Sequence, residues 1–119
     1  MGITTENLET TETGSILIME SNNSPVYENS WVDYHVAWKP VKYWKDCYGI
    51  VHIEGMMKNG TMLVSAFTLP DGYRPAGRIA FYSESANADG RVDVLTDGTV
   101  VPYGGTNGWI NFNVMFRPA

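Results

Sequence analysis

The segment "VPYGGTNGW", residues 101–109, combines side chains of the kinds that bind sugars. Tyr103 and Trp109 offer flat aromatic faces for the apolar C–H side of a sugar ring, and Asn107 offers a planar amide for its hydroxyl groups. The preceding run "GRVDVLTDG" adds three further hydrogen-bonding side chains, Arg91, Asp93 and Asp97. We predict that these six residues form a saccharide-binding site.

Alternative interpretations apply to three of the six residues. Trp109 precedes the last apolar run and is equally well placed to anchor a strand at the edge of the core. Asp97 belongs to an Asp-Gly pair, in which the aspartate most often serves the turn itself. Asp93 stands between two valines in a strand-like run, so it is predicted on the face opposite to them, toward solvent or a partner.

Carboxylates in pairs also raise the possibility of glycoside hydrolysis. Such enzymes use two acidic side chains on either side of the scissile bond, and Glu54, Asp93 and Asp97 are candidates for this role. However, residues 31–119 contain eight acidic side chains, and a domain of this size brings some of them together by chance. The sequence therefore favours a binding protein over an enzyme.

His52 and Glu54 are two residues apart and share one face of a predicted strand, where they could hold a metal ion or transfer a proton. The other soft ligands, His35 and Cys47, have no ligand spacing relative to them. We therefore expect an ordinary strand histidine and no metal. The run "YGGTNG" lacks the Gly-Lys-Ser/Thr ending of a phosphate-binding loop, and we expect no cofactor.

Charge and hydropathy exclude several classes of partner. The net charge of −5 comes from five glutamates within residues 1–30, and the rest of the chain balances eight acidic against eight basic residues. That body lacks the basic excess that holds nucleic acid or an anionic membrane surface. No apolar run approaches the roughly 18 residues that a membrane span requires. A neutral ligand suits this composition better.

The composition changes abruptly along the chain, because all the aromatic residues lie from Tyr27 onward. We therefore divide the chain of 119 residues into an acidic, Thr/Glu-rich arm, residues 1–26, and one domain, residues 27–119. The arm contains one possible short strand, "SILIME".

Period-two alternation of apolar residues predicts an all-β domain. It is clearest in "WINFNVMF", where Ile110 and Phe112 alternate with Asn111 and Asn113. Asp97-Gly98 and Asn59-Gly60 each separate two strand-like runs and predict hairpins. Further strands are predicted at residues 31–37, 41–44, 48–57, 61–68, 78–85 and 91–95. About eight short strands without helical periods indicate an antiparallel sandwich or barrel of jelly-roll or Greek-key type.

Two connecting regions have distinctive features. In "TLPDGYRP" the two prolines fix φ, and Gly72 provides a position with positive φ, so a shaped connector is predicted. In "TMLVSAF" both faces of the predicted strand are apolar. Such a strand is buried either inside a sandwich or against another subunit.

The runs "YGIVHIEG", "TLPDGYRP", "VDVLTDGTV" and "GWINFNVMF" together resemble, in this order, the C-terminal receptor-binding head domains of tail fibre and baseplate proteins from phages of Gram-positive bacteria. The resemblance covers most of the body, and "LPDGYRP" looks like the family's rigid crossover between the strand after the first hairpin and the next strand. It implies a compact all-β head, usually a homotrimer, at the tail tip of the virion. Binding residues in this family vary with the host, so no ligand contact is transferred.

The resemblance also implies the partners: a host cell-wall saccharide, other copies of the chain, and other tail or baseplate proteins. A second interpretation is a structural tail or baseplate domain that trimerises and has no ligand of its own. The two differ in surface chemistry. A binding head should expose a polar cleft with an aromatic wall, whereas a scaffold should bury Trp109 and Tyr103 in protein contacts.

Overall fold

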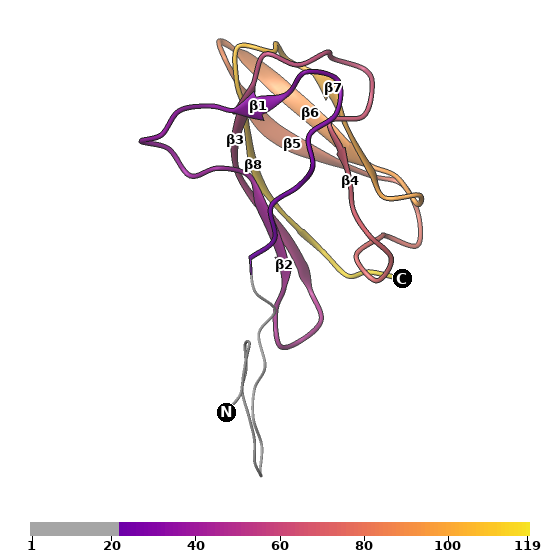
Figure 1. Ribbon diagram of the computed structural model, residues 1–119. Coiled ribbons are helices and arrows are strands. Elements are labelled where there is room, and N and C mark those ends of the chain that lie inside the picture. The colour runs from indigo at the N-terminus through magenta and orange to yellow at the C-terminus, as the bar shows by residue number, and fades with distance from the viewer. Residues whose placement is uncertain (1–21) are drawn as a thin grey trace.

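The computed structural model describes residues 22–119, which form one curled antiparallel sheet with the shape of a half-barrel (Figure 1). This confirms the predicted all-β class. No helix in the described range is long and apolar enough to cross a membrane. The strand predicted at residues 15–20 lies outside the described residues. The strands are β1 Val32–Asp33, β2 Lys42–Lys45, β3 Val51–Lys58, β4 Phe67–Thr68, β5 Ile79–Ser85, β6 Ala88–Val94, β7 Thr99–Gly104 and β8 Ile110–Phe116.

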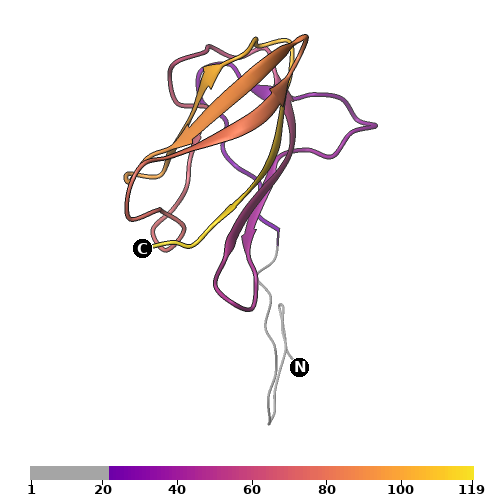
Figure 2. The ribbon, with the colours of Figure 1, turned by 180° about the vertical axis from the view of Figure 1, so that it is seen from behind.

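The last strand of the chain lies in the middle of the sheet. The strand order is β1-β3-β8-β5-β6-β7-β4, and β2 also pairs with β3. β8 pairs with β3 along its whole length, from Val51↔Phe116 to Met57↔Ile110. Seen from behind, β5 and β6 cross the molecule as broad adjacent ribbons (Figure 2). Strands distant in sequence thus form one continuous surface.

Alternation along the strands separates two faces of the sheet. The concave inner face carries the core, and its largest fully buried side chains include Trp31, Phe67 and Phe112. Asn111 and Asn113 of β8 therefore point to the opposite side, as predicted. We call that side the outer face. It also carries outward side chains from β3, β5, β6 and β7.

The hairpin predicted at Asp97-Gly98 is confirmed. It joins β6 to β7, and Gly98 has a φ of 90°, which glycine adopts without strain. The Leu95 amide donates a hydrogen bond to the Thr99 carbonyl at 2.9 Å and closes the turn. Here the local turn chemistry and the tertiary pairing agree.

The hairpin predicted at Asn59-Gly60 is wrong. The chain does turn there, since Asn59 has a φ of 70°, but β3 pairs with β1, β2 and β8 and not with the segment that follows. Gly60 packs directly on the Trp31 ring, where an added Cβ would lie 2.1 Å from ring carbons. The Trp31 indole also donates to the Thr61 carbonyl at 3.2 Å. These contacts direct the chain away from β3.

The segment after this turn crosses to the other edge of the sheet. Backbone amides of Leu63 and Ala66 donate to the carbonyls of Pro102 and Val100 of β7, each at 2.8 Å. Only Phe67–Thr68 is strand, in place of the predicted residues 61–68. Ala66 is buried and Leu63 is exposed, so this segment is not a strand buried on both faces within the chain. The strand predicted at residues 31–37 is likewise reduced to Val32–Asp33.

The connector between β4 and β5 has the predicted shape. Gly72 has a φ of 89°, and the Tyr73 amide donates to the Pro70 carbonyl at 3.1 Å to close a turn. Arg74 Nε donates to the Leu69 carbonyl at 2.8 Å. The C-terminus lies beside this connector in both views (Figures 1 and 2), where the last amide donates to the Arg74 carbonyl.

The inner face contains one buried hydroxyl, Ser83 Oγ, without a hydrogen-bond partner among the described residues. Burying an unpaired hydroxyl is unfavourable, so Ser83→Ala should raise the free energy of unfolding by about 1 kcal/mol. Ser85 provides a matched control on the same strand, because its buried hydroxyl donates to the Thr106 carbonyl and accepts from the Thr106 amide. Ser85→Ala should destabilise. Chemical denaturation measures both, and equal losses in the two variants would contradict the expectation.

Candidate functional site

A shallow groove runs across the outer face over three neighbouring strands. Its polar side chains meet through strand register: Glu54 of β3 lies opposite Asn113 of β8, and Glu84 of β5 lies opposite Asn111. At a strand spacing of about 4.8 Å, β3 and β5 lie roughly 10 Å apart, which is the length of two sugar rings. Period-two alternation places these side chains outside because their neighbours belong to the core.

The groove includes the point where β5 and β8 separate. The two strands pair only at Glu84↔Asn111 and Ser85↔Ile110. Beyond these pairs the outer face has a hollow lined by Tyr82, Glu84, Asn111 and Asn113. The incomplete pairing between these two strands therefore leaves space on the outer face of the sheet.

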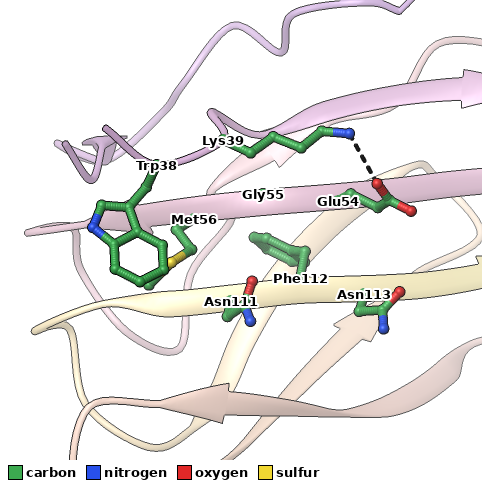
Figure 3. Close-up of a pocket in the computed structure, with 8 residues that line it drawn as sticks. All are labelled: Trp38, Lys39, Glu54, Gly55, Met56, Asn111, Phe112 and Asn113. Carbon is green, nitrogen blue, oxygen red and sulfur yellow. Dashed lines mark hydrogen bonds and ion pairs between the residues drawn. The ribbon is translucent and has the colours of Figure 1, made fainter. Parts of the chain in front are cut away.

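A second hollow of about 370 Å³ lies between the β1–β2 loop and the sheet (Figure 3). Trp38 stands at one end of it above Met56, and the two asparagines of β8 line its other side. Lys39 extends along β3 to Glu54, with Nζ and Oε1 2.8 Å apart, and both residues line the hollow. Asn111 lines both hollows, so they form one groove.

Gly55 positions the wall of this hollow. Its φ is 119°, and an added Cβ would lie 2.2 Å from the Pro40 carbonyl oxygen. The Met56 amide donates to the Lys39 carbonyl at 3.0 Å. Pro40 forms a backbone bridge with Met56, so residues 39–41 lie directly beside β3, and they can approach this closely only because residue 55 has no side chain. This close approach brings Trp38 to the edge of the groove.

Three aromatic rings form the wall of the groove. Tyr34 makes edge-to-face contacts with Trp38 and Trp109, with centroids 6.1 and 6.5 Å apart. Together with Met56, Glu84 and Asn111, these rings line a further hollow that continues the groove. Trp38 is 55% exposed, whereas Trp109 is half-buried. A ligand in the groove would meet an aromatic surface held in place by ring packing.

The structure does not bring the six predicted residues together in one site. Trp109 lines the groove, and its half-buried position beside Tyr34 also fits the alternative of a residue at the edge of the core. The side-chain amide of Asn107 donates a hydrogen bond to the Gly60 carbonyl at 3.0 Å, and the backbone carbonyl of Asn107 accepts one from the backbone amide of Asn59. Asn107 thus joins two loops.

Asp97 lies in the turn before β7, at the opposite end of that strand from Tyr103. Its Oδ1 accepts hydrogen bonds from the Thr99 amide at 3.0 Å and the Thr99 hydroxyl at 2.7 Å. These bonds hold the pKa of Asp97 below its ordinary value. The turn interpretation of Asp97 is therefore the one that fits.

The remaining three predicted residues form a separate cluster on the outer face. Asp93 does project away from the valines beside it, but it does not reach solvent, because Arg78 and Arg91 cover it completely. Burial alone would raise the pKa of Asp93, yet the hydrogen bonds and charges of the two arginines hold it below the ordinary value. Tyr103 lies against both guanidinium groups.

Several residues of the groove were not predicted from the sequence: Tyr34, Trp38, Glu84, Asn111 and Asn113. The asparagines were placed on the outer face by alternation, and their regular spacing in an apolar strand was the available signal. No comparable signal existed for Trp38, because its position depends on the close approach of residues 39–41 to β3.

His52 is an ordinary strand histidine, as predicted. Its Nε2 lies 2.8 Å from Asp46 Oδ2, and its ring stacks on Trp44 at 5.1 Å. The hydrogen bond from His52, followed by the Ile50 amide, lowers the pKa of Asp46. Glu54 is engaged by Lys39. The described part of the chain contains no group of three or more His, Cys, Asp or Glu side chains able to hold a metal ion.

The groove can bind a flat, hydroxylated molecule through non-covalent contacts. Its rings supply apolar faces, and its amides and carboxylates supply planar hydrogen-bonding groups within one or two sugar lengths. No protein-family model, characterised protein or solved structure shows significant similarity to this chain.

Proposed function

We propose that this protein is the saccharide-binding head of a phage or prophage tail and that its groove binds the cell-wall glycan of a Gram-positive host. One observation carries the binding function: the aromatic wall of Tyr34, Trp38 and Trp109 stands directly beside Asn111 and Glu84 on the outer face. The four sequence runs that resemble tail receptor-binding domains support the assignment to a virion.

The mechanism is reversible adhesion. A sugar ring stacks on the exposed face of Trp38, and its hydroxyl groups bond to Asn111, Asn113 and Glu84. An open groove with few contacts gives weak affinity at each site. In a homotrimer, and with many copies on one virion, tethered sites raise the effective concentration and supply avidity without new contacts. The other tail or baseplate proteins hold these copies in place.

The positions of the carboxylates support binding without catalysis. Of the three acidic residues considered for hydrolysis, Glu54 is paired with Lys39, Asp93 is covered by two arginines, and Asp97 caps a turn. The low pKa of Asp93 and of Asp97 disfavours a role as general acid, which needs a raised value.

The proposal predicts that Trp38→Ala and Asn111→Ala each weaken binding to wall polysaccharide about tenfold, equivalent to about 1.4 kcal/mol. The tryptophan supplies a stacking face and the asparagine supplies hydrogen bonds at the centre of the groove. Binding is measured with labelled protein on a panel of Gram-positive cells and their purified polysaccharides. Competition by the free polysaccharide shows that the glycan is the receptor.

Tyr48→Ala provides the control, because Tyr48 is 82% exposed in the β2–β3 turn and does not line the groove. It should bind like the wild type, and all three variants should keep the wild-type circular dichroism and solution mass. Equal affinity of wild type and Trp38→Ala would reject the groove as the site. A folded oligomer that binds none of the cells would favour the alternative of a structural tail domain.

A further inference from the structure

Two arginines, a tyrosine and a buried aspartate form a compact cluster beside the groove. Arg78 immediately precedes β5, Arg91 and Asp93 lie on β6, and Tyr103 lies on β7. The guanidinium carbons of Arg78 and Arg91 lie 4.9 and 5.0 Å from the centre of the Tyr103 ring. The ring and the aspartate therefore fix both guanidinium groups in one place.

The hydrogen bonds to Asp93 use one edge of each guanidinium. Arg78 directs Nε and Nη2 to Oδ2, both at 2.7 Å, and Arg91 directs Nε to Oδ1 and Nη2 to Oδ2, both at 2.8 Å. Since a guanidinium is planar and has five N–H donors, the Nη1 side of each group is turned away from Asp93. Its orientation is set before any ligand arrives, which lowers the entropy lost on binding.

The charges of the cluster do not cancel. Two guanidinium groups face one carboxylate, which leaves one positive charge. Asp93 is fully buried, whereas the side chains of Arg78 and Arg91 are 45% and 53% exposed. Asp89, the next acidic side chain along the same face of β6, forms no ion pair with Arg91 in the described structure. The excess charge is thus accessible from solvent.

We propose that Arg78 and Arg91, oriented by Asp93 and Tyr103, form a subsite for a singly charged oxyanion, such as a carboxylate or a phosphodiester. Guanidinium groups match the geometry of such oxyanions, and a single negative charge balances the cluster. Tyr82 of β5 lines the groove and is the cross-strand partner of Arg91 of β6. The subsite is therefore adjacent to the groove and continues it. The anion-binding subsite itself does not depend on the proposed function. Only the identity of the molecule that carries the anion, an acidic saccharide, rests on it.

The subsite is tested on the whole protein by titration with three small probes while the Nε–H signals of its arginines are followed by NMR. The probes are glucuronate for a carboxylate, dimethyl phosphate for a phosphodiester, and glucose as the neutral sugar. We expect the Arg78 and Arg91 signals to shift saturably with at least one anion and not with glucose. The anion that binds more tightly identifies whether the subsite is suited to a carboxylate or to a phosphodiester.

Arg91→Lys keeps the charge but loses the planar fork, so it should weaken anion binding about tenfold. Arg117→Gln removes an arginine outside the cluster and should leave the affinity unchanged. Non-saturating shifts with both anions, equal shifts with glucose, or an equal loss in Arg117→Gln would overturn the subsite. If the protein still binds neutral polysaccharide, only the subsite fails; if it binds the anions but no cell wall, only the proposed receptor function fails.

Discussion

Replacing Gly55 by alanine is expected to lower the free energy of unfolding by about 4 kcal/mol, because two separate penalties combine. The φ of 119° is one that alanine adopts only with strain. The new Cβ would also lie 2.2 Å from the Pro40 carbonyl oxygen and 2.7 Å from Val41 Cα. These are backbone atoms of the segment that lies beside β3, and they cannot rotate away. Equilibrium denaturation in urea measures the loss.

Substitutions at two other glycines distinguish the cost of backbone strain from the cost of the steric clash. Gly49 has a φ of 83° but open space around its Cβ position, so Gly49→Ala should cost about 1 kcal/mol from backbone strain alone. Gly77 has neither feature among the described residues, and Gly77→Ala should change stability by less than about 0.5 kcal/mol. A loss in Gly55→Ala no larger than that in Gly49→Ala would show that residues 39–41 do not press on β3.

The same substitution should affect the groove. The alanine methyl group would push residues 39–41 away from β3 and move Trp38 with them. Under conditions in which the variant remains folded, its affinity for wall polysaccharide should therefore fall at least as far as in Trp38→Ala. Stability and binding would then depend on one close approach between a loop and a strand.

The second large effect is expected for Asp93→Ala, which should lower the free energy of unfolding by about 2–3 kcal/mol. The substitution leaves two guanidinium groups beside each other without their shared acceptor. The loss is smaller than for a fully buried ion pair, because both arginines are about half exposed and can be hydrated. Asp71→Ala is the matched control: its exposed carboxylate pairs with Arg74 at 3.1 Å and should contribute less than about 1 kcal/mol.

This effect should depend on pH in a defined direction. The pKa of Asp93 is lower in the folded protein than the value of about 3.9 expected for an unfolded chain. Its ionised form therefore stabilises the fold above that pH, and the contribution is lost as the pH falls through the folded pKa. The difference between wild type and Asp93→Ala should be constant from pH 7 to about 5 and shrink below about 4. A difference that grows on acidification would contradict the ion-pair explanation.

Structural features that depend on residues adjacent in the sequence were predictable from the sequence. The alternation in β8 determined which side chains enter the core, and it placed Asn111 and Asn113 on the outer face. The hairpin at Asp97-Gly98 and the positive φ of Gly72 follow from turn chemistry that involves only a few adjacent residues. The satisfied environment of His52 also agrees with its strand position.

The groove and the arginine cluster depend on pairings between distant segments, so local patterns named Arg91, Asp93 and Tyr103 as site residues but did not show that Arg78 joins them or that the groove lies elsewhere. Asn59-Gly60 has the backbone of a turn, yet β3 takes β8 as its neighbour because that pairing extends over the whole strand and completes the core. β8 in turn places its asparagines beside Glu54 and Glu84, and the pairing of Ala80 with Asp93 brings Arg78 to that carboxylate. Alternation and turn preferences decide which way each residue faces, whereas the register between strands decides which residues meet.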